Sequence, residues 1–550
     1  MNRSTRRPLA AIVLAGILAL AAACSQSPAG GAGNSPGAAP ESAAPSQHPN
    51  RITIGMTNPP LMFNPVDTDA SGSNAAVFVN RYLFDTLFKM TAPLEFKLQL
   101  AESFEQKDDR TYVVKLNKDA QWTDGKPVTA YDFEFTANLV ANPKTLSTVR
   151  ANIAFLEGLN DKSRLPEGVS KLSGVKVIDD KTFELVTASP VDPNLIQERL
   201  SEFHILPKHV LENADPASLN SHAFWKNPAV TSGPYVFGKF DNNVVQLTAN
   251  PNYYRGAPSI QEVVVKVMPA ANMVAQLQSQ EIDMNAGQGP GNIPPKEWET
   301  IKKMGHIQTM EEPTRRYNSI EINTTRIPDK KVRQAMAYAI NREAIVNQLM
   351  KGIGEIQDGP YSNSHPYHDK DILKYDYDPE KAKQLLQEAG WDSSRVLEFI
   401  VPTGDAVREM AGNIVQQNLE AVGVKVKQVN FDFATAVQRA VKGEFDLFIS
   451  SFGSLVDPDG PSNTYKSTAA LNDMRYNNPR VDELFALGMK ETDKEKRFAI
   501  YKELQNLIQE DVPLITIYSE KNLIALNKAI EGRGGTIYGM HYDVHEWSIR

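Results

Sequence analysis

The chain contains 550 residues, enough for several domains at roughly 100–200 residues each. Hydrophobic residues make up 41% and charged residues 23% of it, close to the average for globular proteins. This composition excludes a disordered chain, a collagen-like chain and a protein that crosses the membrane many times. The formal net charge of −8 leaves no basic footprint, so we expect no nucleic-acid partner.

The single cysteine lies where it has a specific use. Cys24 follows a basic start and an apolar run over residues 9–23, which is too short to span a bilayer comfortably. This pattern predicts a secretory signal peptide over residues 1–23. The junction Leu20-Ala-Ala-Ala-Cys resembles a bacterial lipobox, so we predict that Cys24 carries lipid, palmitate included. The alternative is an ordinary signal peptide with a spare cysteine.

Residues 24–50 complete the predicted attachment segment. After Cys24 this segment is rich in Gly, Ala, Pro and Ser and contains no Lys or Arg, so it cannot form a core. We interpret it as a flexible tether that holds a folded body at the extracytoplasmic face of the cell membrane. Both the outer face of a Gram-positive membrane and a periplasm fit this pattern.

The first half of the folded part has the patterns of strands and hairpins. Alternating apolar and polar residues, with turn residues between them, predict several strands and one helix. The strands are expected at residues 51–56, 112–116, 235–250 and 261–268, a hairpin at 174–187 and a helix at 130–140.

The second half is richer in helices. We predict helices over residues 332–349 and 379–389, and then two units in which a helix, a glycine and an apolar strand follow one another. These units are helix 408–422 with strand 424–429, and helix 434–441 with strand 445–451. Such units indicate an α/β protein whose parallel sheet is covered on both faces. Because ligands bind beyond the carboxyl ends of such strands, the pattern points to residues 450–459.

Six segments, in order, carry a resemblance to a known family. They are residues 121–133 (QWTDGKPVTAYDF), 231–235 (TSGPY), 250–254 (NPNYY), 281–284 (EIDM), 332–343 (VRQAMAYAINRE) and 377–390 (YDPEKAKQLLQEAG). From about Ile52 to the C-terminus the chain resembles the extracellular solute-binding proteins of family 5, the oligopeptide- and dipeptide-binding lipoproteins of ABC importers.

The resemblance implies a two-lobed fold of the periplasmic-binding-protein type II, with mixed sheets, a hinge and a small inserted domain. Carried onto this sequence, lobe I is residues 51–95, 178–284 and 512–550, the inserted domain is 96–177, and lobe II is 285–511. It also implies a monomer that captures a solute, an oligopeptide by preference, between closing lobes and passes it to the permease subunits.

The expected ligand contacts lie on both lobes. Phe452 matches an aromatic residue that follows a lobe II strand in peptide-binding relatives, but Leu455 stands where those relatives have an aspartate for the peptide amine. Either Asp457 or Asp459 supplies that charge, or the ligand presents no free amine there, because an unpaired buried ammonium is costly. The expected contacts are Asn74, Tyr254, Phe452, Gly453, Ser454 and Asp457.

The solute class stays open at this point. Relatives that bind dipeptides have an arginine in the segment corresponding to residues 400–403, and none is present here. Longer peptides, oligosaccharides, opines and metal chelates remain alternatives. The basic pair Arg315-Arg316 fits either a contact to a ligand carboxylate or a solvated strand end.

We expect no catalytic residues, no metal and no cofactor. The motifs Gly-x-Ser-x-Gly and His-Glu-x-x-His are absent. Ser173 and Lys176 match Ser-x-x-Lys, but they lead into a strand instead of a helix. His365 and His368 are a conceivable metal pair but fit a surface loop better. A surface lipoprotein hydrolase and a receptor that presents a signalling peptide are the weaker alternatives.

Overall fold

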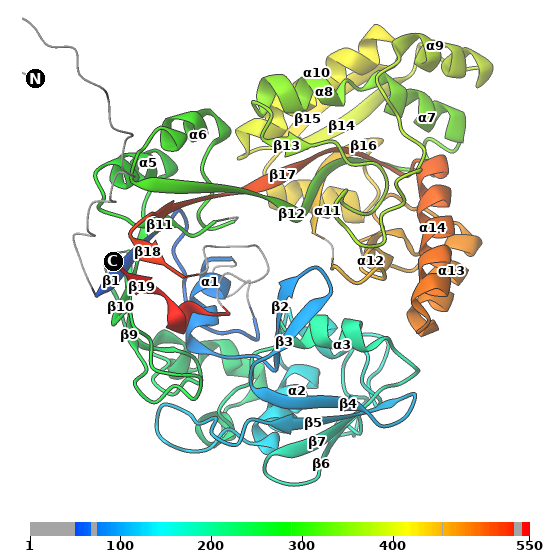
Figure 1. Cartoon of the computed structure of the whole chain (residues 1–550). Coiled ribbons are helices and arrows are strands. Elements are labelled where there is room, and N and C mark those ends of the chain that lie inside the picture. Colours follow the sequence, from blue (N-terminus) through cyan, green and yellow to red (C-terminus); the bar gives the residue numbers. More distant parts are fainter. Residues whose placement is uncertain are drawn as a thin grey trace, which may run out of the picture. The chain divides into compact units, whose positions relative to one another are not determined.

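Figure 1 shows the computed structural model of the chain, which describes residues 50–67, 74–241, 243–287, 289–453, 455–469, 471–532 and 542–550. The predicted signal peptide, Cys24, the tether up to residue 49 and Ser454 lie outside the described residues. Within the described ranges, no helix is both long and apolar enough to cross a membrane.

The elements up to residue 285 are mostly short strands. In chain order they are β1 (Arg51–Met56), α1 (Asn74–Leu83), β2 (Phe88–Ala92), β3 (Glu95–Leu98), β4 (Ala101–Gln106), β5 (Thr111–Leu116), α2 (Ala130–Ala141), η1 (Arg150–Ile153), β6 (Val175–Val177), β7 (Thr182–Val186), α3 (Pro193–Leu200), α4 (Lys208–Leu211), η2 (Pro216–Ser221), η3 (Ala223–Lys226), β8 (Tyr235–Asp241), β9 (Val244–Ala249), β10 (Glu262–Val267), α5 (Ala270–Gln278) and β11 (Met284–Asn285).

Longer helices and the two longest strands follow. They are α6 (Pro295–Lys302), β12 (Ile307–Ile322), α7 (Lys330–Ala339), α8 (Arg342–Ala344), η4 (Ile345–Leu349), β13 (Gly354–Glu355), α9 (Pro379–Glu388), β14 (Val396–Pro402), α10 (Ala406–Ala421), β15 (Lys425–Phe431), α11 (Phe433–Val441), β16 (Leu447–Gly453), α12 (Ser462–Tyr465), α13 (Pro479–Lys490), α14 (Lys494–Asp511), β17 (Leu514–Asn527), β18 (Ile530–Glu531), η5 (Val544–Glu546) and β19 (Ser548–Ile549).

One large sheet runs through most of the fold. It has 11 strands in the order β15-β14-β16-β12-β17-β11-β1-β10-β9-β8, with β13 paired to β17. β1 pairs in parallel with β10 and β11, and β14 with β15 and β16, whereas β12 and β17 are antiparallel to each other. The α/β class with mixed parallel and antiparallel pairing is therefore confirmed.

Two strands, β12 and β17, connect separate hydrophobic cores. β12 begins at Ile307, which packs in a cluster with α5 and α6, and its other end carries Ile320, which packs in a cluster with α7 and α10. β17 has Ile517 in that second cluster and Ile524 in the large cluster around β1, α1 and α3. We refer to the side of β1, α1, α3, α5 and α6 as lobe I, and to the side of α7 to α14 as lobe II (Figure 1).

The predicted helix–glycine–strand units are present in lobe II. Gly423, with a φ of 92°, follows α10 and leads into β15, and Gly443, with a φ of 74°, follows α11 and leads into β16. A glycine in the left-handed region is the usual residue just past the end of a helix. Because β14 pairs in parallel with both β15 and β16, the carboxyl ends of these three strands lie at the same edge of the sheet.

One predicted helix is interrupted. Apolar spacing predicted a single helix over residues 332–349, but α7 ends at Ala339 and α8 begins at Arg342. The side chain of Asn341 accepts a hydrogen bond from the backbone N–H of Ala344, at 2.8 Å, and so caps a new helix. Local side-chain bonding to the backbone overrides the periodic pattern here.

A separate sheet of four strands, in the order β4-β5-β7-β6, belongs to the predicted insert. The predicted hairpin at residues 174–187 is its β6–β7 pair. Because β7 pairs along β5, this sheet extends to Val186, beyond the insert boundary expected at residue 177.

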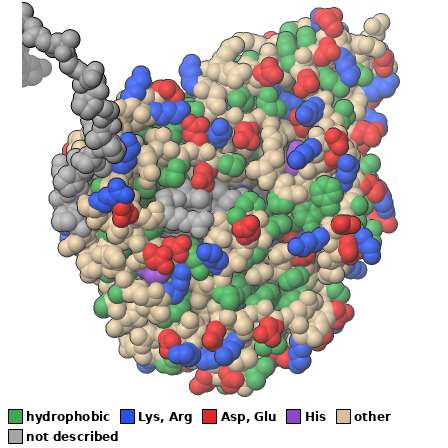
Figure 2. All heavy atoms as spheres, in the orientation of Figure 1, with side chains coloured by type: hydrophobic (Ala, Val, Ile, Leu, Met, Phe, Trp, Pro, Cys, Tyr) green, Lys and Arg blue, Asp and Glu red, His purple; other side chains and the backbone are tan. Residues whose placement is uncertain are grey.

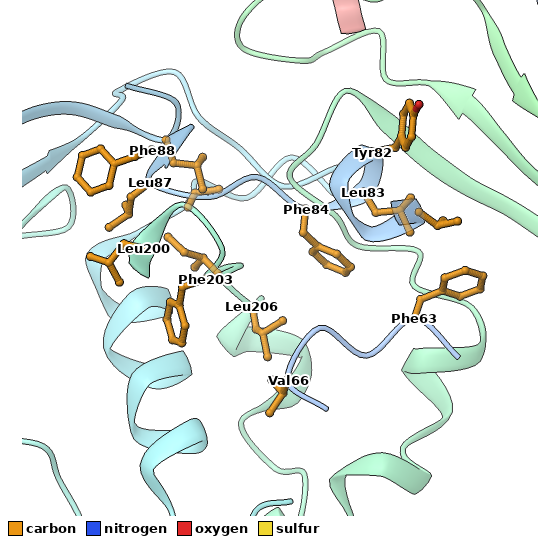
Figure 3. Close-up of a cluster of buried hydrophobic side chains, with 14 of the residues drawn as sticks. Phe63, Val66, Tyr82, Leu83, Phe84, Leu87, Phe88, Leu200, Phe203 and Leu206 are labelled. Carbon is orange, nitrogen blue, oxygen red and sulfur yellow. The ribbon is translucent and has the colours of Figure 1, made fainter. Parts of the chain in front are cut away.

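A buried cluster fixes the two lobe I helices that matter most for the site. Figure 3 shows Leu83 at the end of α1, Leu87 and Phe88 at β2, and Leu200 at the end of α3 within this cluster. All four side chains are completely shielded from solvent. The residues that precede Tyr82 and Leu200 on these helices, Arg81 and Arg199, are thereby held in place.

Candidate functional site: the cavity between the lobes

A cavity of about 460 Å³ lies between lobe I and lobe II. Residues from α1 and α3 line it on one side, residues from β12 lie at the connecting strands, and Gly453 and Leu455 at the end of β16 line it on the other side. This volume lies within the range of about 300–1,000 Å³ that is usual for small-molecule sites.

A β-bulge places two arginines at this cavity. The pairing of β12 with β17 shifts its register between Pro313 and Tyr317. The hydroxyl of Thr314 donates to the carbonyl oxygens of Arg316, at 3.0 Å, and Glu520, at 2.9 Å, and these bonds hold the bulge. Because a bulge changes the direction of neighbouring side chains, Arg315 and Arg316 both line the cavity.

Glu198 of α3 bonds directly to the backbone of lobe II. Its carboxylate accepts the backbone N–H groups of Val456 and Asp457, each at 2.6 Å, and the side chain is fully buried. Arg315 lies 3.5 Å from the same carboxylate. Burial raises the pKa of Glu198, and Arg315 and the two N–H groups oppose that shift. The loop after β16 is thereby fastened to α3.

A buried ion-pair network reinforces this contact. The guanidinium of Arg497 on α14 lies 2.9 Å from Asp457 and 3.3 Å from Asp192, the N-cap residue of α3. The three side chains are between 0% and 7% exposed. Removing one partner of such a network costs about 3–5 kcal/mol, because a charge is left buried without compensation.

Asp459 lies beside this network, and no cationic side chain among the described residues forms an ion pair with it. Its carboxylate accepts a hydrogen bond from the hydroxyl of Ser462, at 3.0 Å. Burial, followed by the charge of Asp457, raises the pKa of Asp459 to about 7. This carboxyl is therefore partly protonated near neutral pH.

Glu202, just after α3, is the acidic residue of the cavity lining. Its carboxylate lies 3.5 Å from Arg81 and 3.8 Å from Arg315. Burial alone would raise the pKa of Glu202, but Arg81, Arg315 and Lys89 lower it to about 2. Glu202 is consequently ionised at neutral pH and offsets part of the positive charge.

Two of the predicted ligand contacts, Gly453 and Phe452, lie at or next to the cavity, whereas Tyr254 and Asp457 bond to other side chains of the protein. Gly453 lines the cavity, and Phe452 packs against the cavity residue Tyr317 with ring centroids 5.8 Å apart. Tyr254 instead donates its hydroxyl to the buried Asp85, at 2.9 Å, away from the lining residues. Asp457 is fully buried and forms an ion pair with Arg497, at 2.9 Å.

Two further predicted contacts are described only in part or not at all. Asn74 is the first residue of α1, and its side chain lies outside the described atoms, although α1 does supply Val77, Phe78 and Arg81 to the cavity. Ser454 is not described. Asp459, the alternative acid, is buried next to Asp457.

Two cavity residues were not predicted from the sequence. Arg81 and Arg199 stand near the carboxyl ends of α1 and α3, directly before the core residues Tyr82 and Leu200, and this position is the only signal they give. His365 and His368 join no metal cluster: the described ranges hold no group of three or more potential metal ligands.

The fold and this cavity together define a two-lobed solute-binding protein. The model of the family described as "Bacterial extracellular solute-binding proteins, family 5 Middle" matches residues 95–473. The protein therefore belongs to this family, and the predicted two-lobed α/β fold is confirmed.

Individual relatives align with most of the chain. The sequence is 28% identical to the oligopeptide-binding protein AppA of Bacillus subtilis (strain 168), over 98% of this chain and 99% of that protein. It is 27% identical to the periplasmic oligopeptide-binding protein OppA of Salmonella typhimurium, over 83% of this chain and 85% of that protein. The solved structure of Bacillus subtilis AppA in complex with a nonapeptide matches with a TM-score of 0.75 and 26% identity, covering 92% of this chain and 100% of that one.

The raised pKa of Asp459 predicts a specific pH dependence of stability. Because the folded state binds this proton more tightly than the unfolded state, the free energy of unfolding falls as the pH rises from about 4 to about 7. The variant Asp459→Asn lacks this titration, so its stability relative to the wild type increases over that interval. Urea denaturation at several pH values measures the difference.

The control for this experiment is Asp371→Asn, since the Asp371 side chain is 91% exposed. Substitution of this exposed residue should change the free energy of unfolding by no more than about 0.5 kcal/mol. A constant difference between Asp459→Asn and the wild type would contradict the buried, partly protonated state of Asp459.

Proposed function

We propose that the protein is the extracytoplasmic receptor of an ABC importer and captures an oligopeptide between its two lobes. The observation that carries this proposal is the cavity enclosed by both lobes, whose walls bond to each other through Glu198 and the loop after β16. Membership of family 5 supports it, as do relatives named for oligopeptide binding. Delivery to permease subunits follows from the same relatives.

Binding and lobe motion suffice for this function, so no covalent step is involved. The bulge between Pro313 and Tyr317, opposite residues 519–521, lies within the two strands that connect the cores and is our proposed hinge. A bound peptide shifts the population towards the closed arrangement because it contacts both lobes only there. The permease then reads the closed, loaded state.

We propose two changes to the domain boundaries expected from the sequence, one for lobe II and one for the inserted domain. Residues 285–307 pack through Trp298 and Ile301 with α5, so we place them in lobe I and start lobe II after the bulge. The inserted domain is proposed to include β7 and to end near Val186. Asn74, Tyr254 and Asp457 remain predicted contacts, with Gly453 and Phe452 the better placed of the set.

Attachment through a lipid on Cys24 is part of the proposal. A diacylated or triacylated cysteine anchors stably, whereas a single chain does not. The receptor is proposed to act as a monomer on its tether.

Peptide binding is tested with purified protein lacking residues 1–23. A pool of oligopeptides is expected to raise the free energy of unfolding by about 2.7 kcal/mol when the ligand is present at about 100 times its Kd. Thermal denaturation measures the shift, and pools of oligosaccharides and of metal chelates serve as comparisons. No shift with any peptide pool, together with a shift for a comparison pool, would contradict an oligopeptide receptor.

Closure is tested with Glu198→Gln. This variant keeps the size of the side chain but replaces one acceptor oxygen that receives a lobe II N–H by an amide that cannot accept it. A charge-assisted bond worth about 1.5–3 kcal/mol corresponds to a Kd raised by about 10- to 150-fold, measured by calorimetry. Glu212→Gln, at an exposed position after α4, is the matched control and should bind as the wild type does. Equal affinities of both variants would show that Glu198 does not couple closure to binding.

The anchor is tested with Cys24→Ala in cells that express the full chain. The wild type should fractionate with membranes and incorporate labelled palmitate, whereas the variant should do neither because the thiol that carries the lipid is absent. Membrane-bound Cys24→Ala protein would contradict lipidation at this position.

A further inference from the structure

Four arginines, from lobe I and from the bulge that connects the lobes, line the cavity. Arg81 comes from α1, Arg199 from α3, and Arg315 and Arg316 from the bulge of β12. Glu202 is the one acidic residue among the described residues that line this cavity. This local excess of positive charge stands against a chain whose formal net charge is −8. Over the described surface in view in Figure 2, acidic and basic side chains are interspersed.

The guanidinium groups are poorly satisfied by the protein itself. Charge-assisted N–H···O bonds are about 2.7–2.9 Å long, but Glu202 lies 3.5 Å from Arg81 and 3.8 Å from Arg315. The Nε atom of Arg81 is buried and has no hydrogen-bond partner within the described part of the chain. One carboxylate is thus shared between two cations at distances longer than a strong bond.

The other two arginines have still fewer contacts. Across the residues that the structure describes, the side chains of Arg199 and Arg316 form neither a hydrogen bond nor an ion pair. Arg199 is partly buried and Arg316 is exposed at the cavity mouth. Burial lowers the pKa of Arg199, with Glu198 acting on it only at longer range. A planar guanidinium with free donors is suited to bind a carboxylate through two parallel bonds.

The acidic side chains near the cavity that could attract a ligand cation are buried or already bonded to other groups of the protein. Glu198 accepts two backbone N–H groups, Asp457 pairs with Arg497, and Asp459 is buried. Leu455, which carries no charge, lines the cavity just after β16. An ammonium group in this cavity would therefore meet four cations and a single, already shared carboxylate.

On the basis of the proposed function, we infer that the cavity selects acidic oligopeptides. Arg199 on lobe I binds an acidic side chain of the peptide, and Arg316 attracts a second acidic side chain at the mouth of the cavity. Arg199 lies on lobe I and Arg316 lies in the bulge that is the proposed hinge, so an acidic peptide that contacts both links lobe I to the hinge and favours closure. Arg199 contributes more, because its site is less solvated and less screened than that of Arg316.

The inference is tested on the wild-type protein with three tetrapeptides of equal length. Alanine alternates with glutamate in the first, with glutamine in the second and with lysine in the third. Calorimetry at low salt should give the order glutamate, glutamine, lysine, with at least a tenfold higher affinity for the glutamate peptide than for its neutral isostere. This preference should decrease as the salt concentration rises.

Substitutions of single arginines identify which of them causes the preference for the glutamate peptide. Arg199→Gln should weaken binding of the glutamate peptide by about 10- to 100-fold and that of the glutamine peptide much less, because a hydrogen bond to a charged group is lost only with the former. Arg316→Gln should cost about two- to fivefold. Arg480→Gln, on the exposed face of α13, is the control and should change neither affinity.

The outcomes separate the two proposals. Equal binding of the glutamate and glutamine peptides, or preference for the lysine peptide, overturns the selectivity and leaves peptide capture standing. Binding of none of the three peptides, together with no thermal shift in the oligopeptide pool, overturns the proposed function and the selectivity with it. Melting temperatures of the variants identify any loss that comes from misfolding, and the peptide series on the wild type is independent of them.

Discussion

The structure between the lobes depends on one buried carboxylate. Glu198 is fully shielded from water, and an ionised carboxylate in that position without partners would cost several kcal/mol. Two backbone N–H groups of lobe II, from Val456 and Asp457, supply the bonds that offset this cost. Lobe I can bury Glu198 in this way only while the loop after β16 lies against α3. The arrangement that closes the cavity is therefore also the arrangement that satisfies Glu198.

The remaining features of the site follow from how its elements are held. The buried cluster around Leu83 and Leu200 fixes α1 and α3, and these helices present Arg81 and Arg199 to the cavity. The bulge in β12 adds Arg315 and Arg316 at the place where the sheet passes from one core to the other. Because these connecting strands carry arginines that line the cavity, the proposed hinge and the proposed ligand contacts share the same few residues.

Much of this fold could be predicted from the sequence, because its strongest signals are local. Gly423 and Gly443 end helices and precede parallel strands, and the residues beyond β16 do lie at the cavity. The site chemistry was harder to predict, since it depends on partners far apart in the chain. Nothing near Asp457 shows that Arg497 will neutralise it, 40 positions further on. For the same reason Arg199 gave only a weak signal. The cap at Asn341 is local, but in the sequence it is less conspicuous than the apolar periodicity around it.

Hydrogen exchange at two backbone amides tests the central claim most directly. In the closed arrangement the N–H groups of Val456 and Asp457 are bonded to Glu198 and buried. Saturation with a bound peptide is predicted to slow their exchange strongly relative to the free protein, in which the lobes separate and these bonds open. Glu198→Gln should reduce that protection. Equal exchange rates with and without peptide would contradict a closure that is fastened through Glu198.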